Sequence, residues 1–222
     1  MKAYLYAIPL LCTFLVLASC QRSNYAPEGS SIITVVHAAP LISDIDIYVD
    51  GTQYSNSSLS YPNTSFPYNI FLGNRTWTFN AGGTSNLLHT TSWTLPANTK
   101  QSLFLYDSAA VLSSISLVNN TEALPTGKAA LRLVHLSADA PAVYLDLNGN
   151  AVCPTTAFKG NTNYTTLDAA TLYFELRETG TNSLVKAIPN ITLNPGKYYT
   201  LAVIGLVNGS GKQALSLKLI EE

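Results

Sequence analysis

The chain has 222 residues, of which 47% are hydrophobic and only 11% are charged, and its formal net charge is −1. No basic stripe is available to displace counterions from phosphates, so nucleic acid is not an expected partner. Abundant aromatic and β-branched residues argue against disorder. The composition instead predicts a folded protein whose neutral surface is rich in hydroxyl and amide groups.

The first twenty residues have the layout of a secretory signal. Lys2 precedes an apolar run over 3–17, which is too short for an ordinary membrane-spanning helix. The run ends in Leu17-Ala18-Ser19-Cys20, which resembles the lipobox of bacterial lipoproteins. That resemblance implies a signal peptide over 1–19, cleavage before Cys20 and lipidation of its thiol. A plain signal peptide whose cleavage site contains a cysteine is the alternative.

The lipobox resemblance also implies a location. A tether over 20–30 would follow the lipid, and the protein would be lipid-anchored in the bacterial cell envelope. Gln21, in place of Asp, resembles lipoproteins sorted to the outer membrane. Whether the protein faces the periplasm or the outside stays open.

An internal repeat dominates the remaining sequence. Residues 32–51 resemble residues 130–149, and His37 and His135 are 98 positions apart, as are Gly51 and Gly149. The repeat predicts two tandem domains over 31–124 and 128–222, with the joint where Pro and Gly cluster near 124–127.

Both copies are predicted to consist of short strands. Apolar and polar residues alternate over 45–49 and 143–147, and Asp50-Gly51 and Asn148-Gly149 then signal hairpin turns. Further strands are expected over 77–80, 87–93, 101–107 and 111–117, and over 172–177, 184–187, 198–207 and 213–220. The predicted fold class is all-β: two tandem immunoglobulin-like β-sandwich domains after a lipoprotein signal peptide.

Two stretches of the second copy resemble a known family. Residues 134–143 with Asn148-Gly149 look like the opening of the bacterial domain-of-unknown-function 4397 family, and residues 193–205 look like its closing strand. The first copy departs from this pattern at 39–43 and at Asp107. The resemblance implies exported or surface β-sandwich modules, often lipoproteins, and it supplies no catalytic residues.

Few residues suggest chemistry. His37 and His135 share one repeat position, which invites a metal or catalytic role, but neither has a second ligand at a recognisable spacing. We expect each to donate a hydrogen bond to loop backbone, for His135 around 139–141.

Cys153 would be a buried apolar residue. Asp44, Asp46 and Asp50 could suggest calcium, but a solvated polar face is the better interpretation. No catalytic residue, metal or cofactor is predicted.

The candidate binding residues lie in one polar segment, Tyr54 to Tyr68, which is longer than most connections. Tyr54, Tyr61, Phe66 and Tyr68 could stack on sugar rings or anchor a protein. The alternative is that half of these rings cap the sandwich core. The sequence therefore predicts a non-enzymatic binding or structural module. Either a glycan-binding accessory module or an adhesin or assembly component that binds protein would fit.

Overall fold

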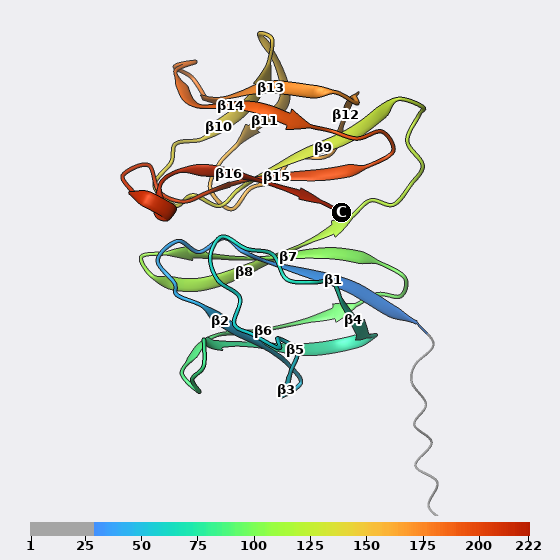
Figure 1. Cartoon of the computed structure of the whole chain (residues 1–222), viewed down its shortest axis with the longest axis vertical. Helices are drawn as coiled ribbons and strands as arrows, with labels where there is room; N and C mark the ends of the chain where they lie inside the picture. Colours follow the sequence, from blue (N-terminus) through green and yellow to red (C-terminus); the bar gives the residue numbers. More distant parts are fainter. Residues whose placement is uncertain (1–28) are drawn as a thin grey trace, which may run out of the picture.

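The computed structural model describes residues 29–222, which form two stacked β-sandwiches (Figure 1). One sheet of the first sandwich has the strand order β4-β1-β7-β8 and the other has the order β3-β2-β5-β6. The strands of this sandwich are β1 (Ser30–His37), β2 (Ile45–Val49), β3 (Thr52–Gln53), β4 (Tyr68–Phe71), β5 (Gly73–Ala81), β6 (Leu87–Leu95), β7 (Lys100–Ser108) and β8 (Val111–Asn119).

The second sandwich is built in the same way from the sheets β12-β9-β15-β16 and β11-β10-β13-β14. Its elements are β9 (Lys128–His135), β10 (Val143–Leu147), β11 (Asn150–Thr156), β12 (Thr165–Asp168), β13 (Thr171–Glu178), β14 (Leu184–Thr192), β15 (Tyr198–Ile204), the short 3-10 helix η1 (Gly211–Gln213) and β16 (Ser216–Glu221). The predicted all-β sandwich class is confirmed. Within 29–222, no helix is long and apolar enough to cross a membrane.

The strand order of the second sandwich repeats that of the first with every label raised by eight. The repetition extends to strand direction, because β1 runs parallel to β7 and β9 runs parallel to β15 while the other pairs are antiparallel. The predicted hairpin turns also form. Asp50 and Gly51 both have positive φ angles, as do Asn148 and Gly149, and this conformation suits a two-residue turn.

The last two strands of the second sandwich differ from their predicted limits. β15 ends at Ile204 instead of Val207, and β16 begins at Ser216 instead of Gln213. Gly205 ends β15 at φ 82°, where an added Cβ would lie 2.4 Å from the carbonyl oxygen of Ala214. The chain therefore turns sharply here, and the apolar residues 206 and 207 belong to an excursion outside the sheet.

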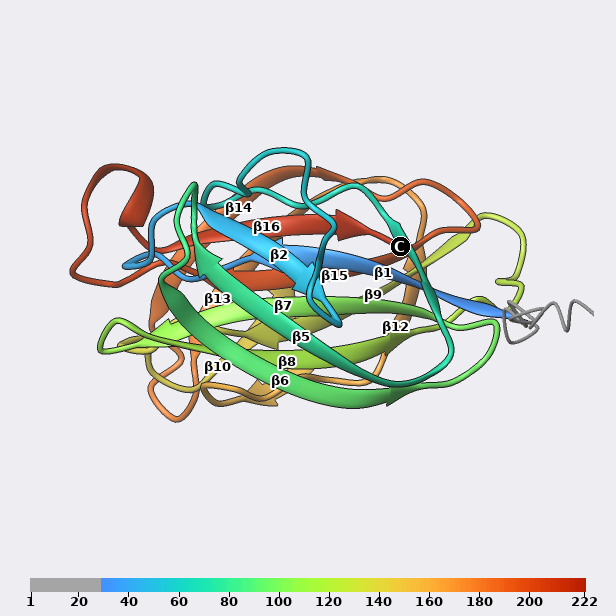
Figure 2. The ribbon, with the colours of Figure 1, turned by 90° about the horizontal axis from the view of Figure 1, so that it is seen from below.

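Each sandwich has its own core, and a third apolar cluster lies between the sandwiches. In Figure 1 the sheet containing β9, β15 and β16 faces the sheet containing β1, β7 and β8, and Figure 2 looks along the stack with β2, β5 and β6 in front. We call the buried residues between these sheets the inter-sandwich cluster. Its members are Val36, Ala38, Phe104, Tyr106, Leu117, Val134, Leu136, Ala202, Ile204 and Ile220.

A buried arginine ties the two sandwiches together beside this cluster. The Arg132 guanidinium donates to Thr200 Oγ1 at 2.7 Å and to Glu222 Oε1 at 2.8 Å within the second sandwich. It also donates to the carbonyl oxygen of Val118 and to Asn119 Oδ1, both at 2.8 Å, at the end of β8. Arg132, on β9, therefore joins the end of β8 in the first sandwich to β15 and to Glu222, the residue after β16, in the second.

Candidate functional site

The candidate site arises where the edge of the first sandwich is interrupted. β3 ends at Gln53, although the Tyr54 amide still donates to the Ile47 carbonyl oxygen at 2.9 Å, and the next backbone pairing with β2 is that of Leu59 with Ile45. In the second sandwich the corresponding strand, β11, continues along β10 as far as Thr156. Residues 55–58 therefore make no backbone-to-backbone hydrogen bond to β2, whereas the second sandwich keeps the corresponding sheet edge paired.

The other wall of the site is the stretch that leads into β4. The Ser65 amide donates to the Val35 carbonyl oxygen at 2.8 Å, and Ser65 Oγ accepts from the Val35 amide at 3.0 Å. The His37 amide donates to the Asn63 carbonyl oxygen at 2.9 Å. These bonds hold residues 63–65 against β1. The chain between Tyr54 and Ser65 therefore passes from the edge of the sheet that contains β2 to the edge of the sheet that contains β1.

Between these walls lies a groove of about 420 Å³, a volume within the range of small-molecule sites. None of the residues that line it carries a charged side chain. They are Tyr54, Ser55, Asn56, Ser57, Ser58, Leu59, Ser60, Asn63, Thr64, Ser65, Phe66 and Tyr68. The groove thus combines aromatic rings with hydroxyl and amide groups, which suits an uncharged polar ligand.

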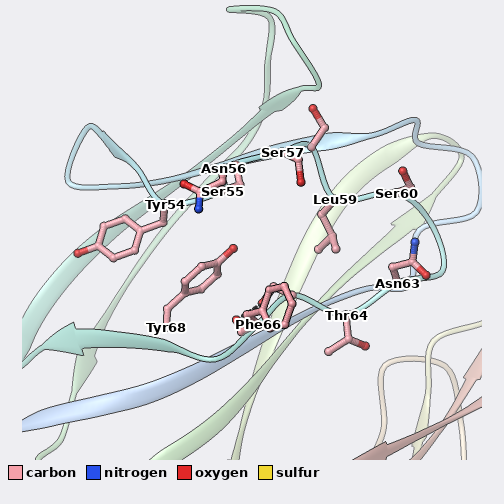
Figure 3. A pocket seen from close by; sticks show the side chains of 12 residues that line it. Tyr54, Ser55, Asn56, Ser57, Leu59, Ser60, Asn63, Thr64, Phe66 and Tyr68 are labelled. Carbon is pink, nitrogen blue, oxygen red and sulfur yellow. Dashed lines mark hydrogen bonds between the residues drawn. The ribbon is translucent and has the colours of Figure 1, made fainter.

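Three aromatic rings form one half of the groove. Tyr54 and Tyr68 pack edge to face with ring centroids 5.8 Å apart, and both contact the first core. Burial raises the pKa of the Tyr68 phenol, so this side chain is neutral. Phe66 is 89% exposed. Figure 3 shows Phe66 between the tyrosine end of the groove and the end formed by Ser60, Asn63 and Thr64.

Polar side chains of the groove fall into two groups. Three of the serines are used by the fold: Ser55 Oγ accepts from the Ile47 amide, Ser58 Oγ donates to Asp46, and Ser65 is bonded to Val35. Within 29–222, the lining side chains that make no hydrogen bond include those of Asn56, Ser57, Ser60 and Asn63. Sequence analysis did not single out these four residues, although the run of Ser and Asn was visible.

Tyr61 does not join the other three candidate residues. Its ring packs edge to face against His37 at 5.7 Å and lies against the inter-sandwich cluster. Burial raises the pKa of its phenol to about 12. The structure therefore brings Tyr54, Phe66 and Tyr68 together and places Tyr61 behind them, toward the second sandwich.

The paired histidines have the backbone role that we expected. His37 Nε2 lies 2.9 Å from the Ser43 carbonyl oxygen, and His135 Nε2 lies 2.9 Å from that of Pro141. In each ring Nδ1 accepts from a backbone amide two residues ahead, at 3.3 Å. Because Nδ1 accepts, Nε2 carries the proton in a neutral ring. Burial lowers the pKa of both imidazoles, which agrees with this neutral form.

Cys153 is buried, as predicted, and burial raises the pKa of its thiol to about 11, so it is a poor nucleophile.

The interpretation of Asp46 as part of a solvated face is wrong. Asp46 is buried, and its carboxylate accepts from Ser58 Oγ at 2.7 Å and from the Gly83 amide at 2.8 Å.

Among the described residues, no three His, Cys, Asp or Glu side chains form a group that could hold a metal. The predicted lipid site, Cys20, lies outside the described residues.

Comparison with solved structures finds only weak similarity. A carbohydrate-binding module of family CBM26 from Eubacterium rectale is 11% identical, with a TM-score of 0.25, and the match covers 85% of this chain and 96% of that one. Candidate cell adhesion proteins from Parabacteroides distasonis and Bacteroides ovatus are 7% and 12% identical, with TM-scores of 0.24 and 0.22. These two matches cover 87% and 86% of this chain and 99% and 96% of the respective proteins. No curated protein matches the chain.

A family model matches residues 31–146, more than half of the chain. The match begins in β1 and ends within β10, so it covers the whole first sandwich and only the opening of the second. Residues 193–205, which we expected to carry part of the family pattern, lie outside it. The chain belongs to the family described as domain of unknown function DUF4397.

Proposed function

We propose that this chain is an exported protein, lipid-anchored through Cys20 in the bacterial cell envelope, whose first sandwich binds a neutral glycan without catalysis. The outer membrane is the proposed location, on the basis of Gln21. The anchor is supported by the order of charge, apolar run, small residues and cysteine in residues 1–20. Two tandem copies of one domain, over 31–124 and 128–222, remain part of the proposal, supported by the repeated strand order.

The observation that carries the glycan proposal is the exposed ring of Phe66 in a groove without charged side chains. An 89% exposed phenylalanine contributes little to the core, but its face can pack against the apolar face of a sugar ring. Asn56, Ser57, Ser60 and Asn63 offer donors and acceptors that the fold does not use. Charged ligands would find no countercharge among the lining residues.

Histidine, cysteine, lysine, arginine and carboxylate side chains do not line the groove, so its serine and threonine hydroxyls have no such base among the lining residues to activate them as nucleophiles. The buried imidazoles of His37 and His135 are occupied by backbone hydrogen bonds. A binding role is therefore better supported than an enzymatic one.

Glycan binding is tested with residues 21–222 on an array of neutral and acidic glycans. We expect binding to a neutral glycan, and Phe66→Ala should weaken it by about tenfold, the effect of a contact residue worth somewhat over 1 kcal/mol. The melting temperature should hardly change because Phe66 is exposed. Phe71→Ala is the matched control, since Phe71 is also an exposed phenylalanine, 52% exposed, but lies outside the groove lining.

Binding that survives Phe66→Ala unchanged would disprove the groove as the glycan site. If the array shows no binding but a protein partner is lost on Phe66→Ala, the adhesin interpretation replaces the glycan one.

The anchor is tested separately by Cys20→Ala in the full chain. We expect the wild-type protein in the membrane fraction, with mass spectrometry showing an acylated Cys20 at the mature N-terminus. The variant should be released or left uncleaved. An unmodified N-terminus at another residue in the wild type would contradict lipid anchoring.

A further inference from the structure

We infer that the second sandwich is a positioning element for the groove: it holds the groove-lining segment 60–67 in place from behind. This inference rests on the proposed binding function for its biological meaning. The contact on which it depends can nevertheless be measured without any ligand. The segment is short: Tyr61, near its start, packs against the inter-sandwich cluster, and Pro67, at its end, lines a cavity between the two sandwiches.

Tyr61 makes the direct contact. Its ring packs against the inter-sandwich cluster, to which Val134, Leu136, Ala202, Ile204 and Ile220 of the second sandwich belong. Ser216 of β16 lies beside its hydroxyl group. Asn63, Thr64 and Ser65 follow within four residues and line the groove. Moving the second sandwich away would remove the support behind this part of the wall.

Pro67 lies beside the second sandwich at the other end of the segment. It lines a cavity of about 210 Å³ between the two sandwiches, together with Ile32 and Asn119 of the first and Glu221 and Glu222 of the second. The exposed Phe66 is its immediate neighbour. Tyr61 and Pro67 therefore both lie beside the second sandwich, while Asn63, Thr64, Ser65 and Phe66 between them line the groove.

The counterpart loop of the second sandwich reaches across in the opposite direction. Phe158 packs edge to face against Tyr106 of β7 at 5.7 Å and lies 6.5 Å from His135. Tyr61 stands against His37 in the same way. Each sandwich thus contributes one loop whose aromatic ring, Tyr61 or Phe158, packs against the inter-sandwich cluster. Arg132 adds its bonds to Val118 and Asn119, so the relative position of the sandwiches is fixed by apolar and polar contacts together.

Hydrogen exchange in the full chain tests the inference. Ala202→Arg places a charged side chain in the inter-sandwich cluster, and Ile115→Lys attacks the same contact from β8, away from the groove. Tyr173→Arg is the matched control because Tyr173 is 48% exposed on β13, away from the inter-sandwich cluster. The probes are the amides of Asn63 and Ser65, which donate to the Ser60 and Val35 carbonyl oxygens.

We expect these two amides to exchange about tenfold faster or more in Ala202→Arg and Ile115→Lys, while amides of the first core strand β5 stay protected. Small-angle scattering should show an increased radius of gyration in both variants. Tyr173→Arg should match the wild type in both measurements. Tyr61→Ala should also accelerate exchange at Asn63 and Ser65, and Tyr61→Phe should restore wild-type rates because the ring makes the contact.

Two results would overturn the inference. Separated sandwiches with unchanged exchange at Asn63 and Ser65 would show that the groove wall holds itself. Unchanged scattering in both Ala202→Arg and Ile115→Lys would show that the contact between sandwiches is not the one described. A wild-type protein that binds no glycan would overturn the proposed function alone, since the exchange readout needs no ligand.

Discussion

Replacing Arg132 by methionine should be among the most destabilising single changes in the chain. The side chains of Arg132 and Glu222 are 5% and 0% exposed, and they are joined at 2.8 Å. Removing one partner of a buried ion pair costs about 3–5 kcal/mol, since the remaining charge stays buried without compensation. Asn119 Oδ1 and the Val118 carbonyl oxygen would lose a charged donor as well, so the contact between the sandwiches should weaken.

The assay is urea denaturation followed by tryptophan fluorescence, with far-ultraviolet circular dichroism alongside it. Both tryptophans, Trp77 and Trp93, lie in the first sandwich, so fluorescence and dichroism coincide only if the sandwiches unfold together. Arg75→Met is the control. Arg75 pairs with Asp50 at 3.0 Å, but these side chains are 26% and 43% exposed, and a surface pair contributes about 0–1 kcal/mol.

Two outcomes would refute the reasoning about Arg132. The first is a loss of stability in Arg132→Met no larger than in Arg75→Met. The second is a double variant, Arg132→Met with Glu222→Gln, that loses as much as the sum of its single changes. Neutralising both partners should cost less than that sum, because no charge is then left buried alone.

Three further predictions concern stability. Burial lowers the folded-state pKa of His37 and His135, so the unfolded chain binds more protons than the folded one as the pH falls. The free energy of unfolding should therefore decrease as the pH drops below about 6.5. Urea midpoints between pH 5 and 8 test this, and the decrease should be smaller in His37→Gln. Ala110 has a φ of 60° in the β7–β8 turn, a conformation that glycine adopts more readily than alanine. Ala110→Gly should therefore raise the unfolding free energy by about 0.5–1 kcal/mol. An unchanged urea midpoint would contradict this. Residues 128–222 alone should fold cooperatively with β-type circular dichroism. The fragment should also self-associate in analytical ultracentrifugation, because Val134, Ile204 and Ile220 become exposed. A disordered fragment would count against this.

Strands with clear alternation could be predicted from the sequence, and strands without it could not. β2 and β10 follow the alternation at 45–49 and 143–147 and end at Asp-Gly and Asn-Gly turns. β3 and β4 are only two and four residues long, so they carry too little pattern to be found. Alternation also misled at Asp46, because period-2 spacing assigns a face but does not show that Ser58 and Gly83 cover that face.

The contact between the sandwiches had a sequence signal that was not used. Every residue of β15 is buried, since one face meets the core and the other meets the first sandwich. The apolar run of β15, interrupted only by Thr200, is of the kind typical of a strand covered on both faces. The direction of Tyr61 had no such signal, because an irregular segment has no period from which to assign a face.

Glycan binding in the groove is tested most directly by fluorine magnetic resonance of protein labelled with 4-fluorophenylalanine and titrated with a neutral glycan selected on the array. The Phe66 resonance is assigned by its absence in Phe66→Leu. We expect the Phe66 signal to shift on titration while the Phe71 signal does not. A ligand that binds and shifts other phenylalanine signals but leaves Phe66 unchanged would contradict the assignment of the groove as the binding site.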